Sequence, residues 1–255
     1  MKRKIRKWVI RLTLTGSFII SLLLLIVLNP ILSYANKTIH NNYIIFSNKS
    51  FNHSLFNQLD EATTLIQSSE FYNPRLKLDI CLNDHSKYTD LIEMIGGKAF
   101  ARGFYNKVVL FGNADFDNNV VELNGYKWNL TQLLAHEIVH CLQFDKMGFW
   151  KSKPIAKIPS WKWEGYAEYI ARKKSDQLDL CLNIKRFLET DKENWSLTFP
   201  DSTIAPREYY RYWIMVQYCM DIKKMKYSQL LADKTPEEVI GREIKDWYNK
   251  IREEK

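Results

Sequence analysis

The chain has 255 residues, of which 46% are hydrophobic and 26% are charged, a composition typical of globular proteins. Nine glycines and seven prolines exclude collagen-like and low-complexity material. The length allows one large domain or two small ones. The formal net charge is +8, and its placement along the chain decides which partners it favours.

Most of the excess positive charge lies at the N-terminus. Six basic residues occur before residue 12 without an acid among them: Lys2, Arg3, Lys4, Arg6, Lys7 and Arg11. Residues 12–35 carry no charge, which leaves a net charge of only +2 on residues 36–255. A nucleic-acid-binding protein would carry a basic face on its folded domain, so we expect no nucleic-acid partner.

The uncharged segment at residues 12–35 predicts a membrane anchor or an export signal. It is long enough for a helix that crosses a bilayer, which needs about 20 apolar residues. The preceding basic cluster predicts a cytoplasmic N-terminus and a translocated remainder. Ser33 and Ala35 are small residues at the positions that determine signal-peptide cleavage. We expect an uncleaved signal-anchor at residues 1–35 and an extracytoplasmic domain, with cleavage and secretion as the alternative.

Residues 36–125 alternate between strand-like and helix-like patterns, which predicts a small mixed sheet. The predicted strands are residues 43–46, 76–82, 100–105 and 107–111. The predicted helices are residues 54–68, where apolar residues recur with a period near 3.6, and residues 88–95, which end at two glycines.

Residues 126–255 are predicted to be mainly helical. Asn129 is a good N-cap for a helix that runs to about Lys146. Further helices are expected over residues 160–173, 179–190 and 207–224, and a last one after Thr235, where a capping box meets a proline. A sheet-containing first part and a helical second part predict one α+β domain over residues 36–255.

The four cysteines, Cys81, Cys141, Cys181 and Cys219, show no CxxC spacing, so they do not predict a zinc site of their own. Outside the cytoplasm they allow three disulfide pairings, and we assign none. Cys141 falls within a helical apolar pattern and is expected to be buried.

The segment around His136 carries the strongest chemical signal. His136 and His140 lie four residues apart, so a helix places their imidazoles on one face, where both can bind zinc. Glu137 lies beside that face and can take a proton from bound water. The alternative is an accidental match on a solvated helix. The apolar character of the rest of this helix argues against it, because burying these side chains without a partner is costly.

A third ligand is expected in the segment that follows, residues 159–170. Glu164 is the best candidate, and Gly165 and Ala167 are small enough to let two helices approach closely. Glu168 lies one helical turn later on the same face, with an ordinary solvated glutamate as the alternative. One carboxylate can bind the metal while the other orients a ligand histidine.

The two motifs together, His136-Glu137-x-x-His140 and Trp163-Glu164-Gly165-x-Ala167-Glu168-Tyr169, resemble the gluzincin metallopeptidases of the peptidase MA-like group. That group includes thermolysin-like enzymes and M1 aminopeptidases. The resemblance implies a zincin-like domain that holds one Zn²⁺ through His136, His140 and Glu164. It also implies that Glu137 is the general base and that Glu168 supports a ligand histidine.

The family also uses a downstream tyrosine to stabilise the oxyanion. Tyr209 gives the best alignment, Tyr210 and Tyr212 are close rivals, and a tyrosine-rich core helix is the alternative. In this family, a strand before the active-site helix often binds substrate through its exposed edge, and Val108–Ala114 is the candidate, with an ordinary sheet strand as the alternative. The connection between His140 and Glu164 is a few residues longer than in the family, and the extra length is placed in the loop at residues 145–159. The chain lacks the Gly-Ala-Met-Glu-Asn motif of M1 enzymes, so the resemblance does not carry an aminopeptidase activity.

The expected function is that of a zinc metallopeptidase, a hydrolase acting on a peptide or protein substrate. The rival hypothesis is a membrane-anchored binding or scaffold module that keeps the metallopeptidase fold without turnover. A third hypothesis, zinc as a structural clamp, fits poorly with three protein ligands and an adjacent glutamate.

Overall fold

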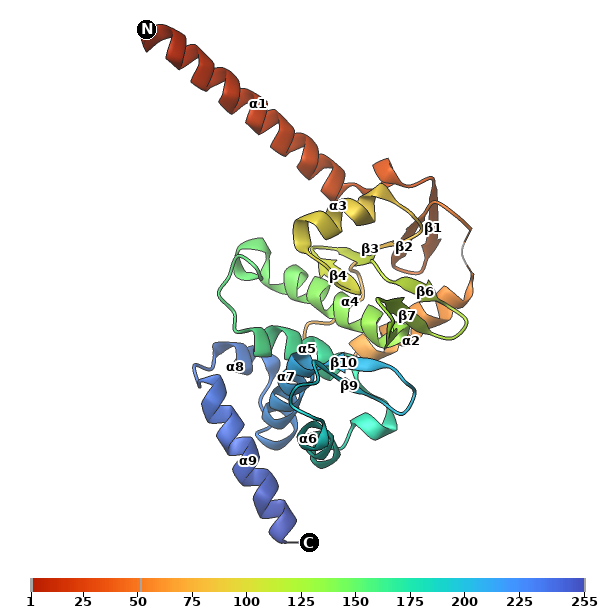
Figure 1. Ribbon diagram of the computed structural model, residues 1–255, viewed down its shortest axis with the longest axis vertical. Coiled ribbons are helices and arrows are strands. Elements are labelled where there is room, and N and C mark those ends of the chain that lie inside the picture. Colours follow the sequence, from red (N-terminus) through yellow and green to blue (C-terminus); the bar gives the residue numbers. More distant parts are fainter. Residues whose placement is uncertain (1, 51, 255) are drawn as a thin grey trace.

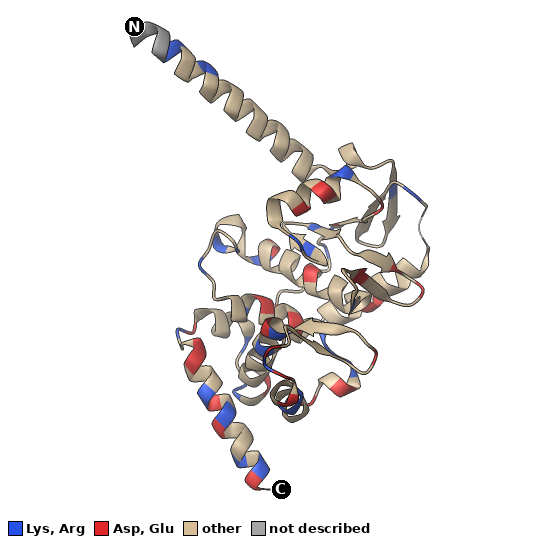
Figure 2. Cartoon of the chain, in the orientation of Figure 1, with Lys and Arg blue, Asp and Glu red and all other residues tan. Residues whose placement is uncertain are grey.

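The computed structural model describes residues 2–50 and 52–254, and its first helix stands away from the rest of the chain (Figure 1). This helix, α1 (Lys2–Leu28), contains the one span among the described residues, Arg6–Leu28, that is long and apolar enough to cross a membrane. Its mean hydropathy is 2.2, and a signal sequence has the same features. Arg6, Lys7 and Arg11 lie near its start, and residues 12–28 of α1 are uncharged (Figure 2). The side chains of Lys2, Arg3 and Lys4 lie outside the described part.

A five-stranded mixed sheet forms the first part of the body. Its strands, in spatial order, are β1 (Asn36–His40), β2 (Tyr43–Ser47), β3 (Leu78–Cys81), β5 (Lys107–Leu110) and β4 (Ala101–Phe104). The three central strands are parallel, and each edge strand runs antiparallel to its neighbour. Side chains alternate between the two faces, so Val108 joins the main core and Val109 joins a smaller cluster on the opposite face.

Helices cover both faces of this sheet. The main core is shared with α2 (Ser54–Ile66) and α4 (Leu130–Met147), and the smaller cluster is shared with α3 (Lys87–Gly96). In Figure 1, α4 crosses the middle of the body between the sheet and the C-terminal helices. Residues 130–143 of α4 are all buried, and the Asn129 side chain caps the helix by accepting a hydrogen bond from the Gln132 N–H, as predicted.

The C-terminal part packs five helices beneath α4: α5 (Ser160–Ala171), α6 (Leu180–Glu189), α7 (Arg207–Gln217), α8 (Tyr227–Ala232) and α9 (Glu237–Glu253). A π-helical turn at Tyr218–Ile222 continues α7. Helices α5 and α7 make the most extensive helix contact, which depends on Gly165. A Cβ at this position would overlap the backbone carbonyl of Tyr212, so the expected close approach of small residues is confirmed.

Five short strands complete the body. Strands β6 (Asn113–Asp115), β7 (Val120–Leu123) and β8 (Tyr126–Asn129) form an antiparallel sheet, and β9 (Ser196–Thr198) pairs with β10 (Ile204–Pro206). The α+β class and the predicted helices and strands are confirmed. The second part is not wholly helical, however, because β8, β9 and β10 lie within residues 126–255. None of the four cysteines, all of which lie in the described part of the chain, forms a disulfide, and Cys141 is buried as expected.

Two predictions about particular segments are wrong. The expected substrate-binding edge at Val108–Ala114 is not an edge of the main sheet. Its first residues belong to β5, which is paired on both sides, and its last two residues belong to β6 in a different sheet. The exposed edge beside α4 is β4 instead. The Thr235 side chain does not cap α9: its hydroxyl donates to Asp233, and Pro236 is the N-cap residue.

Candidate metal centre and its cleft

The three predicted metal ligands lie together between α4 and α5. Their ligand atoms are all within 4.8 Å of one another. The Nε2 atoms of His136 and His140 are 3.1 Å apart, and Glu164 Oε2 lies 3.1 Å from His140 Nε2 and 3.5 Å from His136 Nε2. His136 and His140 are buried, and Glu164 is partly exposed. This group can bind a metal ion.

The far side of the His136 ring faces a buried carboxylate. Nδ1 of His136 lies 3.2 Å from Oε1 of Glu168, and neither atom has another hydrogen-bond partner among the described residues. The second oxygen of Glu168 accepts a hydrogen bond from Nε of Arg172. An ionised carboxylate only accepts, so in the neutral ring this arrangement places the His136 proton on Nδ1 and leaves Nε2 with a free lone pair.

The His140 ring is oriented by Gln143, which lies one turn further along α4. Nδ1 of His140 is 2.8 Å from Oε1 of Gln143. The Gln143 amide donates from Nε2 to the Trp163 carbonyl and the Tyr227 hydroxyl, at 3.2 and 2.7 Å. Because a carbonyl can only accept, the amide oxygen must face His140, whose Nδ1 therefore donates. Nε2 of His140 is also left with a free lone pair.

Three lone pairs thus converge on one point, and this donor set fits a divalent cation. Two imidazole nitrogens and one carboxylate oxygen are the ligand set of catalytic zinc sites, which leave a fourth position open. Burial lowers the pKa of His136, but the hydrogen bonds and charges of Glu164 and Glu168 outweigh burial and raise it to about 10. Burial likewise raises the pKa of Glu164, and the two histidines outweigh this effect and lower it. The space between the three ligand side chains therefore strongly favours a positive charge.

Aromatic rings hold both imidazoles in place. The Trp163 ring stacks on His140 with 5.7 Å between centroids, and the Tyr209 ring stacks on His136 at 6.0 Å, each nearly parallel at 9°. The guanidinium of Arg172 lies over Trp128, Phe199 and Trp213 at 4.9–5.7 Å from the ring centroids. The Glu168–Arg172 pair that supports His136 is therefore itself enclosed by aromatic side chains.

Glu137 lies beside the ligands, on the side of α4 that faces strand β4. Its side chain is nearly buried, and its carboxylate accepts a hydrogen bond from the backbone N–H of Gly103. A Cβ at position 103 would overlap the backbone of Glu137, so β4 approaches α4 this closely only because the residue is glycine.

A cleft of about 810 Å³ opens over the site. Four of the five predicted site residues and the oxyanion candidate Tyr209 line it, the exception being Glu168, which lies behind His136. Its walls come from α3, β4, the segment after α4, and the turn before α7. The apolar and aromatic lining residues include Phe100, Phe104, Trp128, Phe144, Trp163 and Trp195. The cleft is large enough for a peptide segment.

The three candidate tyrosines of α7 have different surroundings. Tyr209 lines the cleft, whereas the hydroxyls of Tyr210 and Tyr212 are hydrogen-bonded elsewhere, to Asn183 and Glu208. Burial and the nearby carboxylates of Glu164 and Glu137 raise the pKa of Tyr209 well above its ordinary value. Its hydroxyl therefore stays protonated at neutral pH and can donate a hydrogen bond into the cleft.

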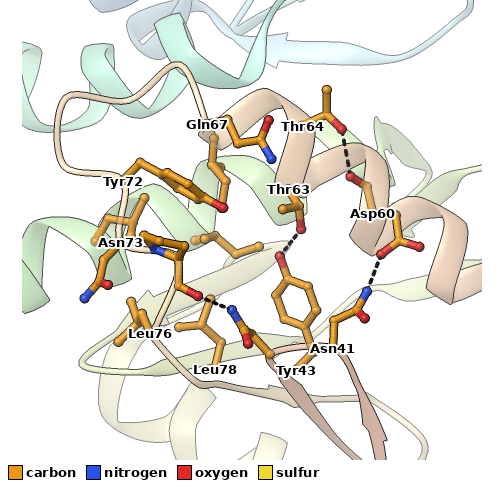
Figure 3. Close-up of a pocket in the computed structure, with 15 residues that line it drawn as sticks. Asn41, Tyr43, Asp60, Thr63, Thr64, Gln67, Tyr72, Asn73, Leu76 and Leu78 are labelled. Atoms are coloured by element: carbon orange, nitrogen blue, oxygen red, sulfur yellow. Dashed lines mark hydrogen bonds between the residues drawn. The ribbon is translucent and has the colours of Figure 1, made fainter.

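A second cavity, of about 270 Å³, lies on the other side of α4 (Figure 3). Ile138 and Leu142 line it, and at 100° per residue they point away from the two histidines. Figure 3 shows mostly uncharged polar groups, with the Tyr43 hydroxyl bonded to Thr63 and Asp60 accepting from Asn41. This cavity contributes no ligand to the metal centre.

Three supporting residues were missed from the sequence: Gln143, Arg172 and Gly103. Gln143 and Arg172 lie three and four residues after the side chains that they support, a spacing that brings helix residues together. That spacing was the available signal for both, and Gly103 had none before the sheet was known. No protein-family model matches the chain, and no curated protein matches it.

Proposed function

We propose that this protein is a zinc metallopeptidase of gluzincin type, with a zincin-like domain at residues 36–255. The observation that supports this most is the convergence of lone pairs from His136, His140 and Glu164 beside Glu137, at the base of an open cleft. Three protein ligands with an open position are typical of catalytic zinc, whereas structural zinc is usually enclosed by four. The substrate class is a peptide or protein.

The chain's own residues supply the remaining parts of a hydrolytic mechanism. A bound Zn²⁺ would polarise the scissile carbonyl and lower the pKa of a water molecule to about 7. Glu137 takes a proton from the attacking water and delivers it to the leaving amine, while the Gly103 N–H holds its carboxylate in position. Tyr209 donates its O–H to the oxygen on which negative charge develops.

The proposed location is a membrane surface. In this proposal α1 remains as a signal-anchor and the catalytic domain lies outside the cytoplasm, because the basic residues at the start of α1 favour the cytoplasmic side. Cleavage after Ala35 would instead release a secreted enzyme.

Hydrolysis by the full chain in detergent tests the proposal. The zinc-loaded protein is incubated with a peptide library, and new termini are identified by mass spectrometry. We expect cleavage by the native chain and by the exposed control Glu122→Gln, and none by Glu137→Gln. If native protein and Glu137→Gln give the same product profile, the activity is absent and the scaffold hypothesis replaces it.

A further inference from the structure

Four large apolar side chains are exposed on two segments that border the cleft. Met94 and Ile95, in the last turn of α3, are 77% and 57% exposed, and Phe149 and Trp150, in the short 3₁₀ turn after α4, are 54% and 77% exposed. We call these four residues the rim. Neither core cluster includes them.

The two segments that carry the rim both contribute residues to the cleft. Ile95 and Lys98 line the cleft from the α3 side, and Lys153 and Pro154 line it from the segment that follows Trp150. Ile95 therefore lies at the entrance to the proposed active site, and the other three rim residues adjoin the two segments that form its walls.

The C-terminal end of α1 contacts α3. The Tyr88 hydroxyl of α3 donates to the Val27 carbonyl at 2.7 Å, and Val27 packs against the cluster that contains Tyr88 and Ile92. Met94 lies six residues beyond Tyr88 on this helix, which is about 9 Å along its axis. A bilayer spanned by α1 would end near Leu28, so its surface would lie close to the rim. In Figure 1, α3 and the green turn after α4 lie on the side from which α1 extends.

The chemistry of the rim matches a bilayer interface. Trp and Phe with aliphatic side chains are enriched at the headgroup level, and lysines beside them contact anionic lipids. Residues 146–160 contain four lysines and no acid: Lys146, Lys151, Lys153 and Lys157. Glu93 of α3 and Asp145 of α4 are the acidic residues that flank these two segments in sequence, and Asp145 already accepts a hydrogen bond from Asn73.

We propose that the rim contacts the lipid bilayer that α1 spans, with its apolar side chains in the headgroup region and the adjacent lysines on anionic headgroups. The cleft then opens at the membrane surface. The substrate class that follows rests on the proposed peptidase function. The substrate is then a polypeptide segment adjoining a membrane, such as the stretch that follows a transmembrane helix.

Lipid quenching of a probe at the rim tests this contact. The full chain is reconstituted in nanodiscs of partly anionic lipid, with a fluorophore on Trp150→Cys in a Cys181→Ser background. The matched control carries the fluorophore on Leu188→Cys, which is 64% exposed on α6, at the other end of the body. Both positions are exposed, so neither substitution removes a core contact.

We expect lipids with a nitroxide at the headgroup to quench the probe at position 150 several-fold more than the probe at position 188. Equal quenching at the two positions would overturn the proposal, and so would protection of position 150 by a second copy of the chain. The readout requires neither metal nor turnover, so Glu137→Gln protein must give the same quenching. Failure of the peptidase proposal would therefore be seen separately.

The substrate class has its own test. The same cleavable sequence is placed directly after a transmembrane segment or behind a long flexible spacer, and each substrate is reconstituted with the enzyme. We expect faster cleavage of the membrane-adjacent sequence in native enzyme and a smaller preference in Trp150→Ser. Equal rates for the two substrates in native enzyme would contradict the proposed substrate class.

Discussion

The backbone N–H of Gly103 donates a hydrogen bond to the carboxylate of Glu137 and so joins the outer strand of the sheet to the helix that carries both histidines. Within the described part of the chain, strand β4 has no strand neighbour on its other side, and the cleft opens beside it. The proposed general base is therefore positioned by the sheet, while the metal ligands are positioned by the helices.

Replacing Gly103 should impair the general base Glu137 and leave zinc binding intact. A Cβ in Gly103→Ala would overlap the Glu137 backbone, displace β4 and lengthen the hydrogen bond. We expect kcat to fall about tenfold or more with zinc retained, because Gly103 is not one of the three ligands. The control Gly241→Ala, where a Cβ meets nothing within 4 Å, should keep full activity and stabilise α9 by about 0.5–1 kcal/mol. Native kcat in Gly103→Ala would contradict the positioning role.

Removal of the Tyr209 hydroxyl should affect turnover and leave substrate binding intact. Tyr209→Phe retains the ring that stacks on His136 and removes the donor in the cleft. We expect kcat to fall roughly 100- to 1,000-fold with little change in KM, as when one oxyanion donor is lost. Tyr212→Phe is the control, because its hydroxyl bonds Glu208 outside the cleft. If steady-state kinetics give equal losses for both variants, Tyr209 has no special role.

The buried pair behind His136 should support both metal affinity and stability. Glu168→Gln removes the charge that faces His136 and leaves the Arg172 guanidinium buried without its carboxylate. We expect zinc affinity to fall about 10- to 100-fold. We also expect the free energy of unfolding to fall by about 3 kcal/mol. Competition with a chelating dye and urea unfolding measure these quantities, with the exposed Glu189→Gln as control. Unchanged zinc affinity in Glu168→Gln would show that Glu168 does not support the ligand.

Metal and proton should compete for the site. The raised pKa of His136, about 10 without metal, means that the apo protein holds a second ring proton, on Nε2, at neutral pH. Zinc binding must release this proton, so apparent affinity should fall about tenfold for each unit of pH lost between about pH 8 and 6. Calorimetry in two buffers of different ionisation enthalpy should report about one proton released per zinc. A pH-independent affinity would contradict this.

The same proton should stabilise the metal-free fold. Because the folded pKa of His136 lies above the value of 6.5 expected for the unfolded chain, the stabilisation is complete below about pH 6.5. It is lost as the pH rises towards 10. Urea unfolding of the apo protein across this range measures the loss, and the His136→Gln variant should not show it.

Local geometry explains which parts of the fold could be predicted from the sequence. The cap at Asn129 and the apolar periods of α2 and α4 depend on neighbours a few residues away, so the sequence alone predicts them. The small sheet of β6, β7 and β8 was missed because its strands are too short to show alternation. Its tight turn still carried a signal, since Asn124 and Gly125 both adopt positive φ, at 54° and 80°, as Asn-Gly does in hairpins.

The same distinction holds at the site. Ligands four residues apart on one helix are brought together by helix geometry alone, and so their convergence could be predicted. The edge next to α4 could not, because it depends on β4 pairing with the outer side of β5. The sequence also could not show which of Tyr209 and Tyr212 lines the cleft, because the orientation of α7 is set by its contact with Gly165 of α5.

The metal content of the purified full chain is the most direct test of the central claim. Native protein, Glu164→Ala and the exposed control Glu189→Ala are loaded with zinc, dialysed and analysed for metal per chain. The three-ligand site predicts about one zinc in native protein and in the control, and almost none in Glu164→Ala. A native chain that retains no zinc, or a Glu164→Ala variant that retains as much as native, would contradict the assignment of His136, His140 and Glu164 as one metal centre.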